Sequence, residues 1–218
     1  MSGATVRAIH RCTTIDPKGT LKHCLDNGVE ILRPRRDFRW CIEHNGFPSM
    51  FKRHCCEELK EYAVMDYVLV GIRRSESVKR GKCIQYYPLL DWTDEDVEEF
   101  VKERGIMCHP LYYDENGKFH VERRLGCMCC PLMYYKKRIE EFRCHPQMIR
   151  FYLRGGVRFM SSHPKSYVHG LYGNVFEWFV CEVFCGGDLE KFRAKYKGSD
   201  CKLLLEEYFG IKLDGVGA

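Results

Sequence analysis

Residues 6–32 read VRAIHRCTTIDPKGTLKHCLDNGVEIL and hold two short apolar runs on either side of a helical stretch. Residues 6–10 predict a buried strand, and residues 21–28 predict a helix that ends at its glycine. Residues 29–32 predict a second strand. Strands that alternate with helices are typical of an α/β fold with a mainly parallel sheet.

The alternation continues along the chain. We expect a helix over residues 38–44, another over residues 55–64 and a strand over residues 67–71. The segments that follow the three strands read RCTTID, RPRRD and GIRRSES, and two of them are strongly basic. Since ligands sit at the carboxyl ends of parallel strands, this pattern favours an anion site at that edge.

The rest of the chain is mostly helical. A helix is expected after Thr93, which can form a capping box with Asp96. Further helices are expected in the last third, with breaks at glycine pairs such as Gly155-Gly156. Their expected ranges are residues 135–145, 147–153, 175–184, 189–196 and 203–209. We therefore predict an α/β core over residues 1–132 and a helical C-terminal region over residues 133–218.

Composition narrows the class of protein. The chain has 218 residues, 45% hydrophobic and 30% charged, which predicts a packed globule. No long apolar stretch and no secretory signal are evident, so a cytoplasmic location is expected and the 14 cysteines should remain thiols. The net charge of +5 suits an anionic substrate and would tolerate nucleic acid.

Cys55-Cys56 and the segment CMCC at residues 127–130 are the strongest chemical signal. A C-x-x-C step lets Cys127 and Cys130 reach one metal group, and two cysteine pairs complete a four-sulfur shell. Adjacent side chains diverge, which favours a [4Fe–4S] cluster over a single zinc ion. Two alternatives stay open: Cys129 as a ligand, and buried thiols at Cys55 and Cys56 with the second pair acting in redox chemistry.

The segment GIRRSES at residues 71–77 is the second signal. Its glycine lets a ligand approach the backbone closely, and its arginines can each form two parallel hydrogen bonds to a phosphate or sulfate. The candidate anion ligands in and after this segment are Arg73, Arg74, Ser75, Ser77 and Arg80. A basic surface loop is the alternative interpretation.

Four motifs occur in one order: RHCCEELK, GIRRSES, YPLLDWTDEDVEEFVKERGI and HPLYYDENGKFHVERRLGCMCCPL. Together they resemble the phosphoadenosine phosphosulfate (PAPS) reductase family of adenine-nucleotide α-hydrolase-like proteins, from about residue 6 to residue 132. The resemblance implies a Rossmann-like sheet, an adenine nucleotide or sulfonucleotide, and a [4Fe–4S] cluster on Cys55, Cys56, Cys127 and Cys130. It also implies that Arg124 belongs to the anion site.

The resemblance implies roles for two further parts of the site. Lys60 matches a family lysine near the cluster. The reductases also work with thioredoxin, so a thioredoxin-like reductant is an expected partner.

Two family segments are not found in this sequence. Family members open with a strand and an S-G-G-x-D-S loop, whereas this sequence opens at what resembles the second family strand. We therefore expect weaker nucleotide binding and an exposed sheet edge that favours homo-oligomers. The reductases also end in an E-C-G-x-H tail; here Cys201 is the last cysteine and is expected to lie in a helix capped by Ser199 or Asp200.

The sequence thus supports three functions. The first is reduction of a sulfonucleotide to sulfite. The second is cleavage of ATP to AMP and pyrophosphate in nucleic-acid sulfur modification. The third is a catalytically degenerate subunit that carries a cluster and acts through a partner.

Overall fold

The structure is a computed structural model that describes residues 6–49, 51–61, 68–75, 86–123 and 125–216. It contains two compact units. The first comprises residues 1–16, 29–62 and 127–218, and the second comprises residues 17–28 and 63–126. The predicted boundary between residues 132 and 133 remains a prediction.

The described sheet belongs to the first unit. Strands β1 (Ile9–Arg11) and β2 (Glu30–Leu32) pair in parallel, with His10 opposite Ile31. The loop after β1 is tied to the end of β2, because the Cys12 amide donates to the Leu32 carbonyl at 2.9 Å. The parallel α/β character expected from the sequence is confirmed.

The second unit holds helices α1 (Thr20–Asp26) and α4 (Asp94–Glu103) and the short 3-10 helix η2 (Pro110–Tyr112). Thr93 and Asp96 form the predicted capping box, with each side chain bound to the other residue's amide. Where a third strand was expected, over residues 67–71, the described part, residues 68–71, forms an isolated parallel bridge between Leu69 and Tyr86.

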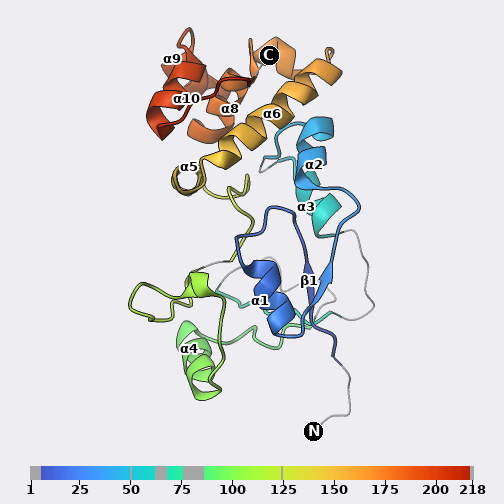
Figure 1. The fold of residues 1–218 in the computed structure, drawn as a ribbon, viewed down its shortest axis with the longest axis vertical. Coiled ribbons are helices and arrows are strands. Elements are labelled where there is room, and N and C mark those ends of the chain that lie inside the picture. Colours follow the sequence, from blue (N-terminus) through green and yellow to red (C-terminus); the bar gives the residue numbers. More distant parts are fainter. Residues whose placement is uncertain (1–5, 50, 62–67, 76–85, 124, 217–218) are drawn as a thin grey trace. The chain divides into compact units, whose positions relative to one another are not determined.

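The remaining helices all lie in the first unit (Figure 1). Their bounds are α2 (Phe38–Asn45), α3 (His54–Leu59), α5 (Tyr135–Cys144), α6 (Gln147–Ser162), α7 (Val168–Leu171), α8 (Val175–Phe184), α9 (Leu189–Tyr196) and α10 (Cys201–Phe209). Helix α3 is shorter than the helix expected over residues 55–64. It ends where the Cys56 carbonyl accepts from both Lys60 and Glu61.

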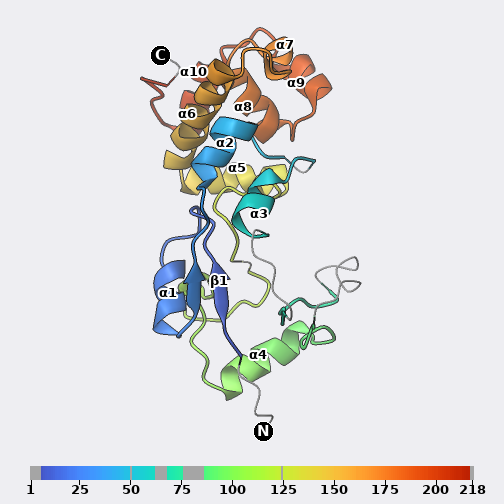
Figure 2. The ribbon, with the colours of Figure 1, turned by 90° about the vertical axis from the view of Figure 1, so that its right-hand side faces the viewer.

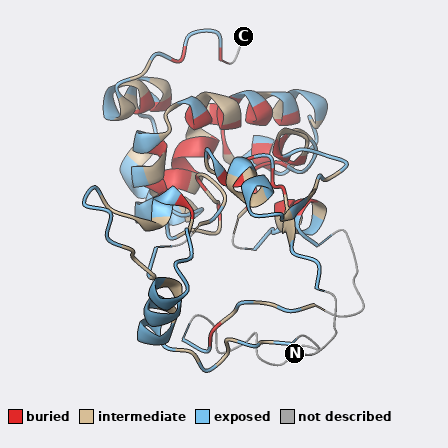
Figure 3. Cartoon of the chain, turned by 60° about the horizontal axis from the view of Figure 1, so that its bottom comes forward, coloured by how far each residue is buried: buried red, intermediate tan, exposed pale blue. Residues whose placement is uncertain are grey.

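The buried residues gather among these packed helices (Figure 3). The largest fully buried side chains include Trp178, Phe38, Phe142 and Phe179. Phe47 lies against Trp178 with ring centroids 4.0 Å apart. This aromatic core is the main apolar support for the cysteine-bearing segments described below.

Helix α6 runs through Gly155 and Gly156, so the predicted break at this pair is wrong. Gly155 lies where α6 packs against α2, and the two helices run side by side in Figures 1 and 2. Gly156 faces Val175 of α8 and Phe47. A Cβ at Gly155 would meet Ile42 Cγ2 at 2.7 Å, and one at Gly156 would meet Phe47 Cζ at 2.7 Å. Tertiary packing therefore selects glycine here, not a helix stop.

Local capping explains why other boundaries were predicted well. The Asn174 side chain accepts from the Glu177 amide at the start of α8, and Asp188 caps α9. Asp200 caps α10, as predicted, by accepting from the Leu203 amide at 3.0 Å. None of the helices formed by the described residues combines the length and apolarity needed to cross a bilayer.

Replacing Gly156 tests the packing of α6. Gly156→Ala places a methyl group 2.6 Å from Val175 Cγ2, so we expect the free energy of unfolding to fall by about 1–3 kcal/mol. Urea denaturation measures the change. The matched control is Gly170→Ala, where nothing lies within 4 Å, and it should leave stability unchanged or raise it by up to about 1 kcal/mol. Equal effects of the two substitutions would contradict the packing.

Candidate functional site

The first turn of α3 carries Cys55 and Cys56, and the helix is placed by its packing against α2. Cys55 is buried at 6% exposure, whereas Cys56 is half-buried. Arg11, at the end of β1, donates to the Lys60 carbonyl just after the helix. The end of the sheet is thereby connected to the cysteine-bearing helix.

Residues 127–132, here named the cysteine loop, supply the second pair of thiols. Lys60 hydrogen-bonds Cys127, and its ammonium group also interacts electrostatically with Cys56 and Cys130. Desolvation alone would lower the pKa of Lys60, but the interactions with these three cysteines outweigh it and raise the pKa. Three thiols thus interact with one lysine, and Cys55 interacts with two of them, Cys56 and Cys130. Cys55, Cys56, Cys127 and Cys130 are here named the thiol quartet.

The two thiols of α3 hydrogen-bond one another. This bond is the main cause that raises the pKa of Cys55, with burial adding to it. The same bond lowers the pKa of Cys56 to about 6 against the opposing effect of burial, and the charges of Lys60 and Arg53 contribute. Cys56 is thus poised as a thiolate near neutral pH, the state that binds metals.

Cys129 differs from the thiol quartet. Its side chain is 0% exposed and belongs to the hydrophobic core, and burial raises its pKa. Its backbone adopts a positive φ of 50°. Full burial separates Cys129 from the half-buried Cys56, Cys127 and Cys130. Cys55 is buried with a raised pKa as well, so these properties do not decide the matter, and Cys129 as a ligand stays a prediction.

Whether the quartet could hold a metal depends on its geometry and its donors. Over the described ranges, no three His, Cys, Asp or Glu side chains converge closely enough to hold one metal ion. The contacts instead link thiol to thiol and thiol to Lys60. The donor set, four cysteine sulfurs, is of the kind that holds iron–sulfur clusters. The pKa is lowered at Cys56 and raised at Cys55 and Cys130.

The loop after β1 is a second polar feature of the first unit. Asp16 accepts from the Thr13 amide and from its hydroxyl, both at 2.8 Å, and His10 Nε2 lies 3.6 Å from Asp16 Oδ1. Burial would raise the pKa of Asp16, but the bonds from His10 and Thr13 lower it to about 2. The sequence signalled this loop only as the polar stretch RCTTID.

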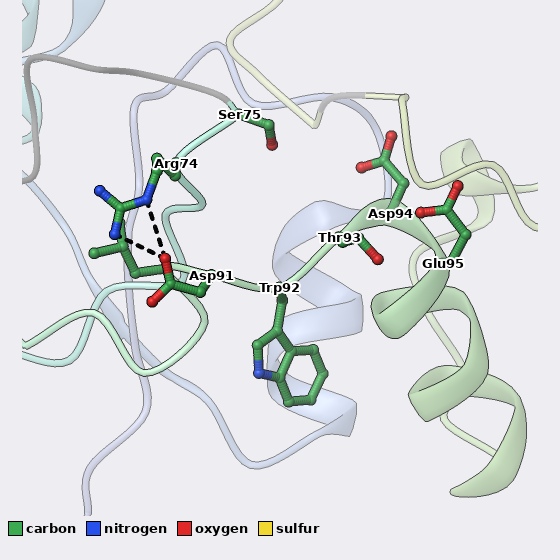
Figure 4. A pocket seen from close by; sticks show the side chains of 8 residues that line it. Arg74, Ser75, Asp91, Trp92, Thr93, Asp94 and Glu95 are labelled. Carbon is green, nitrogen blue, oxygen red and sulfur yellow. Dashed lines mark hydrogen bonds and ion pairs between the residues drawn. The ribbon is translucent and has the colours of Figure 1, made fainter.

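The basic segment GIRRSES lies in the second unit. Arg73 pairs with Asp94, and the Arg74 guanidinium donates to Asp91 at 2.7 Å and 3.0 Å. Arg74 and Ser75 line a cavity of 340 Å³ with Asp91 and residues 92–95 at the start of α4 (Figure 4). An anion at this cavity would share Arg74 with the carboxylate of Asp91, which the sequence pattern did not indicate.

Three of the predicted anion ligands, Ser77, Arg80 and Arg124, lie outside the described residues. Their role remains a prediction. Cys201 is 3% exposed, and burial raises its pKa to about 11. A thiol that stays protonated and buried is unsuited to nucleophilic attack.

The match to a known family covers both the cysteine pairs and the basic segment at residues 71–77. A model of the phosphoadenosine phosphosulfate reductase domain matches residues 10–133. The chain belongs to the PAPS reductase family. The matched range contains all members of the thiol quartet, Lys60 and the basic segment. It ends just before α5, so helices α5 to α10 lie beyond the family domain.

Individual members of the PAPS reductase family and other relatives match shorter stretches. A protein of Escherichia phage 186, described as an uncharacterized 37.8 kDa protein, is 30% identical over 130 residues, covering 47% of this chain and 37% of the phage protein. Phosphoadenosine 5'-phosphosulfate reductases of Xanthomonas euvesicatoria pv. vesicatoria and Xanthomonas axonopodis pv. citri are 36% identical over 66 residues, 25% of this chain and 27% of each reductase. The matches thus span little more than a third of those proteins at most. No solved structure matches the chain.

The lowered pKa of Cys56 predicts its reactivity in reduced, cluster-free protein. Because only the thiolate is alkylated, modification of Cys56 by iodoacetamide should rise with pH around a midpoint of about 6. Mass spectrometry of the tryptic peptide measures it. Cys55→Ala removes the donor and should move the midpoint up toward about 8.5, whereas Cys55→Ser keeps a donor and should move it less. A wild-type midpoint near about 8.5 would contradict the thiol pair.

Proposed function

We propose that this chain reduces the sulfur of an adenine sulfonucleotide, adenylyl sulfate or PAPS, to sulfite, and that the thiol quartet holds a [4Fe–4S] cluster. The observation that carries the proposal is that the thiol quartet interacts within itself, with Lys60 beside three of its members, in a chain of the PAPS reductase family. Membership of the family leads us to expect an adenine sulfonucleotide as substrate, and the four thiols of the quartet provide the ligands for a redox-active cluster.

The quartet supports a cluster over a single zinc ion. Zinc requires four donors that converge tetrahedrally on one point, at sulfur distances of about 2.3 Å. The described side chains do not converge on one point in this way, and the separate iron atoms of a cluster can each take one of the four thiols. When bound, a [4Fe–4S] group would supply a redox-active centre whose potential depends on hydrogen bonds and nearby charge.

Lys60 is well placed to balance the negative charge of the bound thiols and of an anionic substrate. Its ammonium group offsets the negative thiolates of Cys127, Cys56 and Cys130, which lowers the cost of holding them together. The same positive charge favours approach of a sulfonate or phosphate anion. We assign Lys60 both roles, and we keep Arg73, Arg74, Ser75, Ser77, Arg80 and Arg124 as the proposed nucleotide ligands.

The reaction requires two electrons from a reductant, and we propose a thioredoxin-like dithiol. One thiolate of the dithiol attacks the sulfonucleotide sulfur, forms a sulfur–sulfur bond, and displaces the nucleotide phosphate with the electrons of the broken sulfur–oxygen bond. The second thiolate then attacks the first sulfur and releases sulfite. The dithiol leaves as a disulfide, so the sulfonate sulfur is reduced by the two electrons that the dithiol loses.

Anaerobic purification followed by two assays tests the proposal. The wild-type protein should contain iron and acid-labile sulfide, absorb at about 400 nm, and release sulfite from adenylyl sulfate or PAPS with reduced thioredoxin. Cys127→Ser should lose the absorbance and at least about 100-fold of the sulfite release, because it removes a ligand. Cys144→Ser, an exposed cysteine at the end of α5, is the matched control and should retain both.

The outcomes separate the two parts of the proposal. If the protein carries iron and sulfide but releases no sulfite, the reductase reaction is contradicted and the cluster assignment stands. Protein without iron after anaerobic purification and reconstitution contradicts the cluster.

A further inference from the structure

The cysteine loop is held by side chains from two helices that lie outside the family domain. The Cys129 amide donates to Glu141 Oε2 at 2.7 Å, and the Tyr152 hydroxyl donates to the Cys129 carbonyl at 3.0 Å. Arg138 Nη1 donates to the Pro131 carbonyl at 3.2 Å. Arg138 and Glu141 come from α5 and Tyr152 from α6; these three residues are named the clamp.

Two members of the clamp are rigidly buried. Arg138 is 5% exposed and Tyr152 is 4% exposed. Arg138 also donates to the Glu182 carbonyl on α8, and the Tyr152 ring packs against Phe38 and Phe142 at centroid distances of 5.4 Å. Hydrogen bonds from such fixed, desolvated groups impose a definite backbone geometry on the loop.

Two members of the clamp, Glu141 and Tyr152, act at the residue of the cysteine loop whose backbone is least favourable. Cys129 has a φ of 50°, a left-handed conformation that is unfavourable for a residue with a Cβ. Glu141 and Tyr152 bind the amide and the carbonyl of this same residue. Its thiol is fully buried, so the side chain anchors the loop in the core.

The position of Cys129 links this support to the thiol quartet. It lies between Cys127 and Cys130, so the direction in which its peptide groups point sets where the two flanking thiols lie. The Met128 amide is fixed as well, by the Ile15 carbonyl at 2.8 Å. A loop without these bonds would sample many arrangements of its two thiols, at an entropic cost on binding a metal group.

We propose that Arg138, Glu141 and Tyr152 are positioning residues that hold Cys127 and Cys130 in the geometry that binds the cluster. The helical region after residue 133 is then part of the metal-binding site. This inference rests on the proposed function, because it names the support of the same four thiols.

Matched pairs of variants test the clamp. Tyr152→Phe removes a single oxygen and leaves the ring in the core. Its control is Tyr172→Phe, which removes the hydroxyl of a tyrosine that is 5% exposed and interacts with Cys181 in the same bundle. Glu141→Ala removes the acceptor, and Glu141→Gln restores one. The control for glutamate is Glu177→Ala, since Glu177 accepts from the Gly173 amide at 2.7 Å, away from the cysteine loop.

Two measurements report on the clamp. In reconstituted protein, a chelator should remove iron about 10-fold faster from Tyr152→Phe and Glu141→Ala than from wild type, and Glu141→Gln should recover most of the difference. In cluster-free protein, amide hydrogen exchange in the peptide that spans residues 127–133 should be about 10-fold faster in the same two variants. The two controls should match wild type in both measurements.

The proposal is overturned if exchange in this peptide is unchanged in both Tyr152→Phe and Glu141→Ala, or if Tyr172→Phe and Glu177→Ala release iron as fast as their partners. Failure of the clamp can be told apart from failure of the proposed function by the iron content of the wild-type protein. If wild-type protein takes up no iron, the cluster is excluded, and the clamp as a support for the cluster is overturned with it. Hydrogen exchange then decides only whether these side chains hold the loop.

Discussion

The close approach of α2 and α6 is the contact on which the candidate site depends. Gly155 leaves room for Ile42 of α2, and any side chain at this position would separate the helices. Helix α3 packs against α2 and carries the first cysteine pair. One turn before Gly155, Tyr152 of α6 binds the Cys129 carbonyl in the loop that carries the second pair. One helix contact therefore serves both cysteine segments, which lie far apart in the sequence.

Features that depend on neighbours in the sequence could be predicted, and those that depend on distant packing could not. The capping box of Thr93 and the bounds of α8 and α9 follow from side chains within three residues of each helix start. The glycine pair at residues 155 and 156 carries the same local signal as a helix stop. Only the partner helix shows that these glycines permit contact and do not end α6.

The candidate site shows the same division. The spacing of the cysteines identified the thiol quartet, because metal ligands are few in kind and their spacing is distinctive. The supporting residues are ordinary in sequence: Glu141 is one of many acidic helix residues, and nothing local marks Tyr152. Arg73 and Arg74 were predicted as anion ligands from their position after a strand. Their pairing with Asp94 and Asp91 depends on the later segment, so the prediction about anions stays a prediction.

The central claim is that the α3 thiols and the thiols of the cysteine loop lie together in the folded chain. Cross-linking of reduced, cluster-free protein with dibromobimane, a short reagent that joins two nearby thiols, tests it most directly. Peptide mapping should find the peptide of Cys55 and Cys56 joined to the peptide of Cys127 and Cys130, with exposed Cys144 unlinked. Cross-links confined to each peptide by itself would contradict the account.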